Sequence, residues 1–152
     1  MTPSYLAGIM DGEGAIMLPR TGKYKLQGMY TSFCLKIQIA NTNLELLSSI
    51  CSAYGGMIRK QPNPKNKNWK QGYMVTWFGK DAKRILDIVY PELIVKRKVA
   101  DLAYKYLSFI KENPPSCGDG VKPRGRGRSF EQVVELNKIA ADVKCTNKRG
   151  VA

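Results

Sequence analysis

The segment LAGIMDGEG, from Leu6 to Gly14, constrains the fold of this chain more than any other stretch. Its apolar and small residues up to Met10 predict a short helix, and Asp11 and Glu13 stand where that helix ends. Acids are disfavoured there, because the last four carbonyls of a helix are unpaired and carry partial negative charge. Carbonyl and carboxylate oxygens together are ligands for Mg²⁺ or Ca²⁺, so a divalent cation would reverse this penalty. The alternative is two solvated acids in a turn.

Two glycines in the same segment predict a close helix contact. Gly8 and Gly12 lie four residues apart, so they share one side of the helix and leave it without side chains. Another backbone can approach such a stripe closely. Because the segment occurs once, its partner would be the same helix of a second copy, across a two-fold axis. The alternative is that both glycines pack against the chain's own sheet.

Charge and composition narrow the function. The 152 residues carry a formal net charge of +13, which favours a polyanionic partner, nucleic acid before acidic membrane, over a merely solvated basic surface. There is no histidine, and the four cysteines are scattered, which excludes the usual zinc sites and histidine-based triads. Catalysis would have to use carboxylates, amides, lysines and bound metal. Without a long apolar run or a signal-peptide pattern, we expect an intracellular protein and no membrane partner.

The hydrophobic patterns predict alternating helices and strands in one domain. After the first helix we expect strands over 15–19 and 30–40, a helix over 42–54, strands over 57–61 and 72–78, and helices over 81–90 and 93–112. This αββαββα order indicates an α+β core over 1–113: four antiparallel strands with helices on one face and a polar face left open. A basic Gly/Arg-rich linker over 114–128 and a last helix over 129–143 would follow.

The segment LAGIMDGEG resembles the signature motif of the LAGLIDADG homing endonucleases. Leu6, Ala7, Gly8, Asp11 and Gly14 match the motif, and the other four residues are familiar replacements. The order of elements is also similar over nearly the whole chain, and the single copy resembles the homodimeric branch of the family. The resemblance implies a saddle-shaped sheet and an intron-encoded DNA endonuclease, in a prokaryotic cytoplasm or an organelle matrix.

The resemblance also implies roles for particular residues. Glu13 would hold a divalent metal ion with the carbonyl of Gly12; Mg²⁺ is the first candidate, with Ca²⁺ and Mn²⁺ as others, and no small-molecule cofactor is expected. Asn41 would position solvent near the phosphate. Lys96, or Lys98 in the alternative register, would stabilise charge on that phosphate. Asp11 would tie the helix ends together near a dimer interface that includes Ala7, Gly8, Asp11 and Gly12.

Duplex DNA would be read by the polar face of the sheet in the major groove. Strand alternation gives the candidates Ser32, Lys36, Gln38, Arg59, Gln61, Met74 and Thr76, with Arg20, Lys23 and Lys25 in the first hairpin. Arg59 could bind guanine and Gln38 adenine, but either could equally bind phosphate. Further phosphate contacts would come from Lys65, Lys67, Lys70, Arg124, Arg126 and Arg128.

These features together predict a site-specific homing endonuclease. A homodimer would cleave both strands of a long pseudo-palindromic target by metal-dependent phosphodiester hydrolysis. The main alternative is a non-cleaving relative that binds DNA or RNA, such as an intron maturase or a regulator. A basic structural protein of a ribonucleoprotein would explain the charge but not LAGIMDGEG. Glu13 favours the nuclease, since a protein that does not cut has no need of an acid there.

Overall fold

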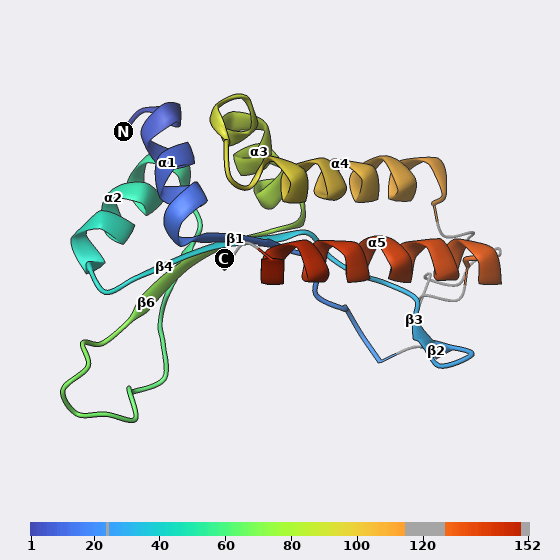
Figure 1. Ribbon diagram of the computed structural model, residues 1–152, viewed down its shortest axis with the longest axis horizontal. Coiled ribbons are helices and arrows are strands. Elements are labelled where there is room, and N and C mark those ends of the chain that lie inside the picture. The colour runs from blue at the N-terminus through green and yellow to red at the C-terminus, as the bar shows by residue number, and fades with distance from the viewer. Residues whose placement is uncertain (24, 115–126, 150–152) are drawn as a thin grey trace. The chain divides into compact units, whose positions relative to one another are not determined.

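The computed structural model describes residues 1–23, 25–114 and 127–149 (Figure 1). Its contacts divide the chain into two units, which are described separately. The first contains Met1–Ile16 and Lys36–Arg97, and the second contains Met17–Leu35 and the chain from Lys98 onward. In the part of the chain that the structure describes, no helix is long and apolar enough to cross a membrane.

The first unit is built on a four-stranded antiparallel sheet. Its strands lie in the order β1 (Gly14–Met17), β4 (Lys36–Asn41), β6 (Tyr73–Phe78) and β5 (Met57–Lys60). β6 pairs antiparallel with both β4 and β5, and Thr76 stands opposite Gln38 on one side and Met57 on the other. Directly paired residues share a face, so alternate residues of the three strands form two distinct surfaces.

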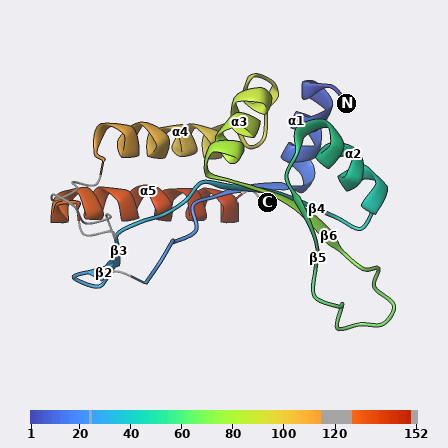
Figure 2. The ribbon, with the colours of Figure 1, turned by 180° about the vertical axis from the view of Figure 1, so that it is seen from behind.

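Three helices cover one surface of this sheet. These are α1 (Pro3–Glu13), α2 (Leu44–Tyr54) and α3 (Gly79–Val89), which lie on the same side in both views (Figures 1 and 2). Thr2 and Asn43 cap the first two helices by accepting hydrogen bonds from backbone N–H groups. The buried core beneath the helices includes Leu6, Met10, Ile37, Ile39, Leu47, Ile50, Val75, Trp77, Ile85, Leu86 and Val89. The opposite surface of the sheet is therefore the one available to a partner.

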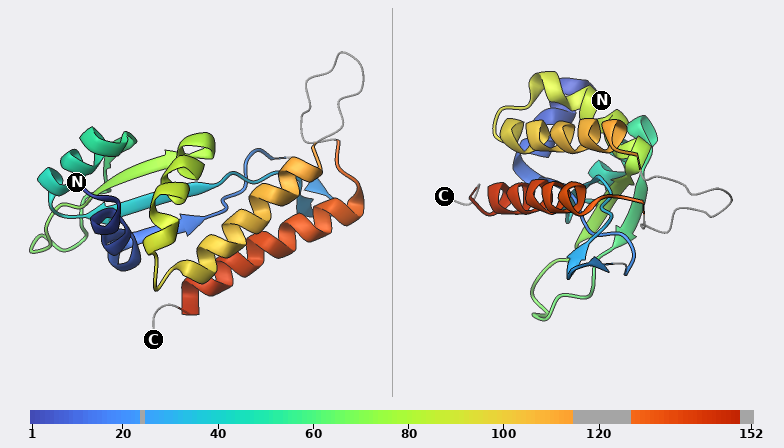
Figure 3. Two further views of the ribbon diagram at one scale, coloured as in Figure 1. Left: turned by 90° about the horizontal axis from the view of Figure 1, so that it is seen from above. Right: turned by 90° about the vertical axis from the view of Figure 1, so that its right-hand side faces the viewer.

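The second unit contains a small hairpin and two long helices. The hairpin joins β2 (Lys25–Leu26) to β3 (Met29–Tyr30) through Gln27 and Gly28, whose positive φ angles of 48° and 83° suit a two-residue turn. α4 (Arg97–Glu112) and α5 (Phe130–Arg149) run side by side (Figure 3). Lys105 and Glu135 join them by an ion pair of 3.1 Å. α5 contacts β3, where the Asn137 amide donates to the Tyr30 carbonyl at 2.7 Å.

The predicted α+β class, the four-stranded antiparallel sheet and the order of its elements are confirmed. The strand predicted over 30–40 is interrupted. Its first part pairs with residues 19–21, through bonds such as Cys34 N–H to the Pro19 carbonyl, and only Lys36–Asn41 joins the sheet. The last helix is longer than predicted, and Ser129 and Gln132 form a reciprocal cap at its start.

The helix predicted from residue 93 begins at Arg97 instead. A short 3₁₀ turn, Tyr90–Glu92, precedes it, and the backbone N–H groups of residues 94–96 are bound by a side chain of α1 rather than by helix carbonyls. These three groups are therefore drawn away from the helical path. This contact between distant parts of the sequence forms one side of the candidate site.

Candidate functional site

The C-terminal end of α1 is tied to the segment that precedes α4 by one carboxylate. The Asp11 side chain accepts hydrogen bonds from the backbone N–H groups of Ile94 at 2.8 Å, Val95 at 3.2 Å and Lys96 at 2.9 Å. Hydrogen bonds to an ionised acceptor are stronger than neutral ones. The first acid of the motif is thus turned away from the helix carbonyls and holds a loop in place.

The side chain of Lys96 lies at the C-terminal end of α1, where the two acids of the motif stand. Its Nζ donates to the backbone carbonyl of Asp11 at 2.5 Å, so a cation lies against the negative end of the helix dipole. Burial lowers the pKa of Lys96 below its usual value, while the negative charges of Asp11 and Glu13 partly oppose that shift. Lys98, the alternative register, is exposed in the first turn of α4. The structure therefore places Lys96 beside both acids of the motif.

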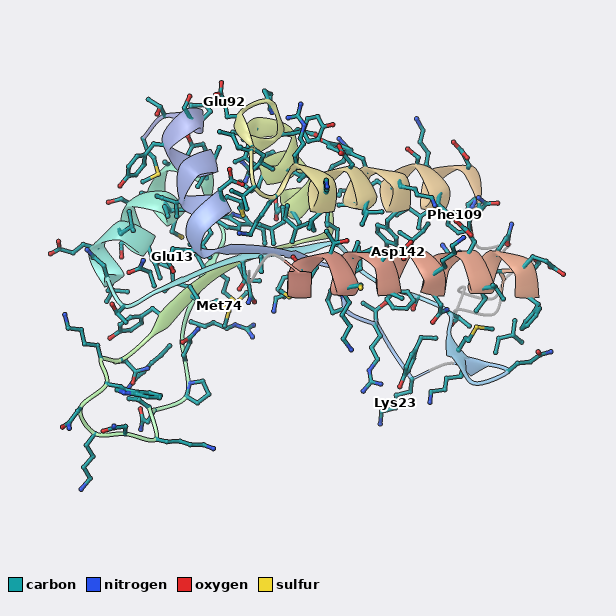
Figure 4. The ribbon with its side chains drawn as sticks, in the orientation of Figure 1. Glu13, Lys23, Met74, Glu92, Phe109 and Asp142 are labelled. Atoms are coloured by element: carbon teal, nitrogen blue, oxygen red, sulfur yellow. The ribbon has the colours of Figure 1, made fainter. Side chains whose placement is uncertain are left out.

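Glu13 is the last residue of α1, and its side chain is exposed (Figure 4). It lines a hollow of about 320 Å³ with residues from the ends of β4 and β5 and the approach to β6: Ala40, Asn41, Thr42, Gln61 and Gly72. The predicted pair Glu13 and Asn41 therefore shares one site. The hollow also includes Gln61, which the sequence had placed on the open face of the sheet.

Gln61 follows directly after β5, which ends at Lys60. Its backbone still pairs with Gly72, but its side chain lies against the Cα of that glycine; a Cβ there would come within 2.3 Å of the Gln61 Oε1. Gln71 fixes the turn by donating from its amide to the carbonyls of Gln61 and Gly72 at 2.8 and 2.9 Å. A glycine at position 72 thus makes room for a second amide beside Glu13.

Asn41 has part of its hydrogen-bonding capacity already in use. Its Oδ1 accepts from the backbone N–H of Asn43 at 2.8 Å, which shapes the turn into α2. The side-chain NH₂ is the group left to face a ligand in the hollow. Asn41 is therefore suited to donate to a phosphate oxygen or a water molecule rather than to accept a proton.

The donor set fits a hard cation. Glu13 and Gln61 offer a carboxylate and an amide oxygen, the ligand types of Mg²⁺ and Ca²⁺ rather than of structural zinc. Within the described ranges, no three His, Cys, Asp or Glu side chains cluster as a metal-binding group. Glu13 is the one carboxylate among the described residues that line the hollow, so the rest of a coordination shell would come from backbone, solvent, nucleic acid or a second copy.

The glycine stripe of α1 is open to solvent. Gly8 and Gly12 are exposed, and a Cβ added at either one would meet nothing within 4 Å. Among the described residues, therefore, these glycines do not pack against the chain's own sheet. Ala7 does: its side chain is fully buried in the core with Leu6 and Met10, so the prediction of Ala7 as a dimer contact is wrong. Helix geometry separates the two sides, since residue 7 points inward when residues 8 and 12 point outward.

The surface of the sheet away from the helices carries most of the predicted base-reading residues. Lys36, Gln38, Met74 and Thr76 lie on it, since they alternate with the buried Ile37, Ile39, Val75 and Trp77, and Arg59 lies on it because it stands opposite Met74. Thr76 is covered, at 5% exposure, because it stands in the central strand between two longer side chains. It is placed to support its neighbours rather than to contact DNA itself.

Sequence reasoning missed two residues of this surface. Phe78 stands opposite Lys36, and Met57 opposite Thr76, and these apolar side chains are 45% and 49% exposed. Extending the alternation of β6 by one step would have identified Phe78. The same step on β5, from Arg59 back to Met57, would have identified Met57, but its position near Phe78 required the register between β5 and β6.

The cations predicted in the first hairpin are partly held within their own unit. Arg20 and Lys25 stack on the ring of Tyr30, at 4.6 and 4.8 Å from its centre. The Ser32 hydroxyl donates to the Thr21 carbonyl at 2.7 Å, so it also has an internal partner. The predicted lysines of the hairpin and of the loop between β5 and β6 are exposed: Lys23, Lys65, Lys67 and Lys70.

Arg128 is not the free phosphate contact that the sequence predicts. It is half-buried, and its Nη1 donates to the Thr31 carbonyl at 3.2 Å. Its Nε is buried without a partner. Arg124 and Arg126 lie outside the described residues.

Solved structures similar to this chain share its fold. The homing endonuclease I-CvuI, in complex with its target in the presence of Ca, superposes with a TM-score of 0.67 at 16% identity, over 95% of this chain and 80% of I-CvuI. The archaeal intron-encoded homing endonuclease I-Vdi141I, complexed with DNA, also gives 0.67, at 14% identity and over 95% and 82% of the two chains. The homing endonuclease I-TnaI gives 0.61 at 17% identity, over 99% and 98%.

No curated protein sequence is significantly similar to the chain. A family model described as LAGLIDADG endonuclease, however, matches residues 6–111. The match begins at the first residue of the motif and extends through α4, so it includes Glu13, Asn41 and Lys96. Because this model matches well over half of the sequence, the chain belongs to the LAGLIDADG endonuclease family.

Proposed function

We propose that this protein is a site-specific DNA endonuclease that cleaves both strands of its target as a homodimer with divalent metal ions. The observation that carries the proposal is the end of α1. There an exposed carboxylate, Glu13, follows an open glycine stripe and lies within electrostatic reach of Lys96. A family member that had lost cleavage would have no need of this arrangement.

The open side of α1 supports the homodimer. A second copy of the helix can approach Gly8 and Gly12 closely, because no side chain of the described residues covers them. Beside this helix end, Ile94 and Val95 are 84% and 66% exposed, and a second copy would cover their apolar surface. This chain covers only 42% of the length of the meganuclease I-CpaMI, which was solved bound to uncleaved DNA. Two copies of this chain would together match a protein of that length, which supports a homodimer.

Crossing of two such helices would bring the two Glu13 carboxylates together near the axis. Each carboxylate would hold a divalent ion together with the adjacent Gly12 carbonyl. Without that positive charge the two carboxylates would repel one another. When bound, such an ion supplies positive charge that stabilises the oxygens of the reacting phosphate. Neighbours of this fold were solved in the presence of Ca and of Mg, which supports a divalent ion here.

The other residues of the site would act on the phosphate and on water. Lys96, anchored at the Asp11 carbonyl, places a positive charge where negative charge develops on the phosphate. The Asn41 amide donates a hydrogen bond to a phosphate oxygen or to the attacking water. Gln61 lies in the same hollow and is proposed as a further polar group that orients this water.

The open surface of the sheet would bind duplex DNA in the major groove, which admits two-stranded ribbons. This surface carries Lys36 and Arg59, and the described strands of the sheet contain no acidic residue. The exposed lysines of the loop between β5 and β6 would extend this positive charge toward the phosphates.

Replacement of Glu13 by Gln tests the proposal. The wild-type protein and Mg²⁺ are incubated with a library of randomised duplexes, and the cleaved molecules are sequenced to recover a target. We expect Glu13→Gln to keep its affinity for that target and to lose at least ~10³-fold in cleavage rate, because a required charge is removed. The matched control is Glu45→Gln, another exposed acid of the same unit, which should cleave normally.

Two results would contradict the assignment. Normal cleavage by Glu13→Gln would show that another group provides the charge. Specific binding by the wild-type protein without cleavage, in Mg²⁺ or Mn²⁺, would identify the non-cleaving relative instead.

A further inference from the structure

We propose that the open surface of the sheet recognises the C5-methyl groups of thymine through Phe78 and Met57. This inference rests on the proposed binding of DNA to the sheet but goes beyond it, since it names the base feature that is read. Thymine is distinguished in the major groove by its methyl group, and apolar side chains are the groups that contact it.

The register of the sheet brings the two apolar side chains near one another. Phe78 lies two residues from Thr76 along β6, and Met57 lies directly opposite Thr76 on β5. Such diagonal neighbours are about 7–8 Å apart. Successive base pairs rise by about 3.4 Å, so the two side chains can contact methyl groups roughly two base-pair steps apart.

Thr76 lies between Phe78 and Met57 on this surface, and it is covered while the two apolar side chains are exposed and form an apolar patch. Thr76 is 5% exposed, whereas Met57 and Phe78 remain about half exposed on a surface that also carries Lys36, Gln38, Arg59 and Met74. Exposed apolar side chains on a surface that binds only phosphate would gain nothing from that partner. Their exposure is explained by an apolar group that they cover on binding.

Each apolar side chain is paired with a cation. The Lys36 Nζ lies 5.6 Å from the centre of the Phe78 ring, and the Arg59 Nε lies 3.1 Å from the Met57 sulfur. These contacts favour fixed positions for the ring and the thioether on the surface. The positive charges also favour nucleic acid over an apolar protein segment as the partner of this patch.

Replacing thymine by deoxyuridine removes the methyl group and leaves the base-pairing edge intact. A binding sequence is first selected from randomised duplexes with the wild-type full chain. Its thymines are then replaced one at a time, and the Kd of each duplex is measured by fluorescence anisotropy in EDTA, so that no cleavage occurs. We expect about a fourfold loss of affinity at each contacted thymine, the effect of one buried methyl group.

Variants assign the contacts to side chains. Phe78→Ala and Met57→Ala should each abolish the difference between thymine and deoxyuridine at one position, whereas Phe78→Leu should retain part of it. Trp69→Ala is the matched control, because Trp69 is an aromatic residue of the same unit that is 65% exposed in the loop between β5 and β6. It should leave every ratio unchanged, and circular dichroism should show that all variants are folded.

The outcomes separate this inference from the proposed function. If no sequence is enriched, specific DNA binding itself fails. If a sequence is enriched but deoxyuridine binds as well as thymine at every position, the methyl contacts are refuted while DNA binding stands. A change of oligomeric state in Phe78→Ala, with unchanged thymine preference, would assign the patch to a protein partner and overturn the inference.

Discussion

Replacing Asp11 by Asn tests whether a carboxylate at the end of α1 organises the segment before α4. In the wild-type protein one carboxylate oxygen accepts from Ile94 and Val95, and the other accepts from Lys96. Asn keeps the size and one acceptor. Its NH₂ group, however, would then face a backbone N–H, and a pair of donors cannot bond.

The expected cost follows from these three bonds. Hydrogen bonds to a charged acceptor contribute about 1.5–3 kcal/mol, against about 0.5–1.5 kcal/mol for neutral ones. Two bonds are weakened and the third is replaced by an unpaired donor, which together should lower the free energy of unfolding by about 2–4 kcal/mol. Because domains of this kind are stable by only about 5–15 kcal/mol, urea unfolding followed by circular dichroism will resolve the change.

A second readout locates the effect. In Asp11→Asn the amides of residues 94–96 should exchange with deuterium faster than in the wild-type protein. Asp87→Asn is the control, because Asp87 lies in the same unit and forms an exposed ion pair with Lys83, worth at most about 1 kcal/mol. Equal destabilisation by both substitutions, with unchanged exchange at 94–96, would refute the role of Asp11.

Two further substitutions test the second unit and the open side of α1. Tyr106 donates from its hydroxyl to the Phe33 carbonyl at 2.6 Å, and burial raises the pKa of Tyr106 to about 12. The folded state therefore favours the neutral form of Tyr106, so the free energy of unfolding falls as the pH rises from about 10 to about 12. Tyr106→Phe should reduce that fall by about 2–3 kcal/mol in unfolding titrations. A pH profile identical to that of the wild-type protein would contradict this. Gly8→Leu should leave the fold intact, since space is open around Gly8, but should raise the dimer Kd at least tenfold by sedimentation. An unchanged dimer would exclude the glycine interface.

Local patterns in the sequence were sufficient for most of the fold. The alternation of residues 36–41 predicted β4, and the helical spacing before Gly55 predicted α2, because side-chain periodicity and backbone conformation are coupled within a few residues. The order of these elements then led to the α+β layer. The start of α4 was predicted wrongly for the complementary reason: the carboxylate that holds residues 94–96 lies more than eighty residues earlier in the chain.

The candidate site shows the same division between local and distant information. The resemblance of the motif to the family singled out Glu13 and, at the end of the predicted strand, Asn41; the structure brings both to one hollow. Alternation with Arg59 placed Gln61 on the open surface of the sheet, but its position beside Glu13 depends on the pairing of its backbone with Gly72, which no local pattern contains. Ala7 was assigned to the wrong side of α1, since helical spacing groups residues by side but does not say which side is buried.

The sequence by itself determined that α1 ends in two acids, that Gly8 and Gly12 share one side of it, and that the chain is strongly basic. These are properties of residue type and spacing, and they require no knowledge of what each residue touches. Only the tertiary structure decided that Asp11 binds a loop, that Lys96 covers the helix end, and that Met57 and Phe78 form one patch. Those relations depend on contacts between residues far apart in the chain, which arise only when the helices and strands pack.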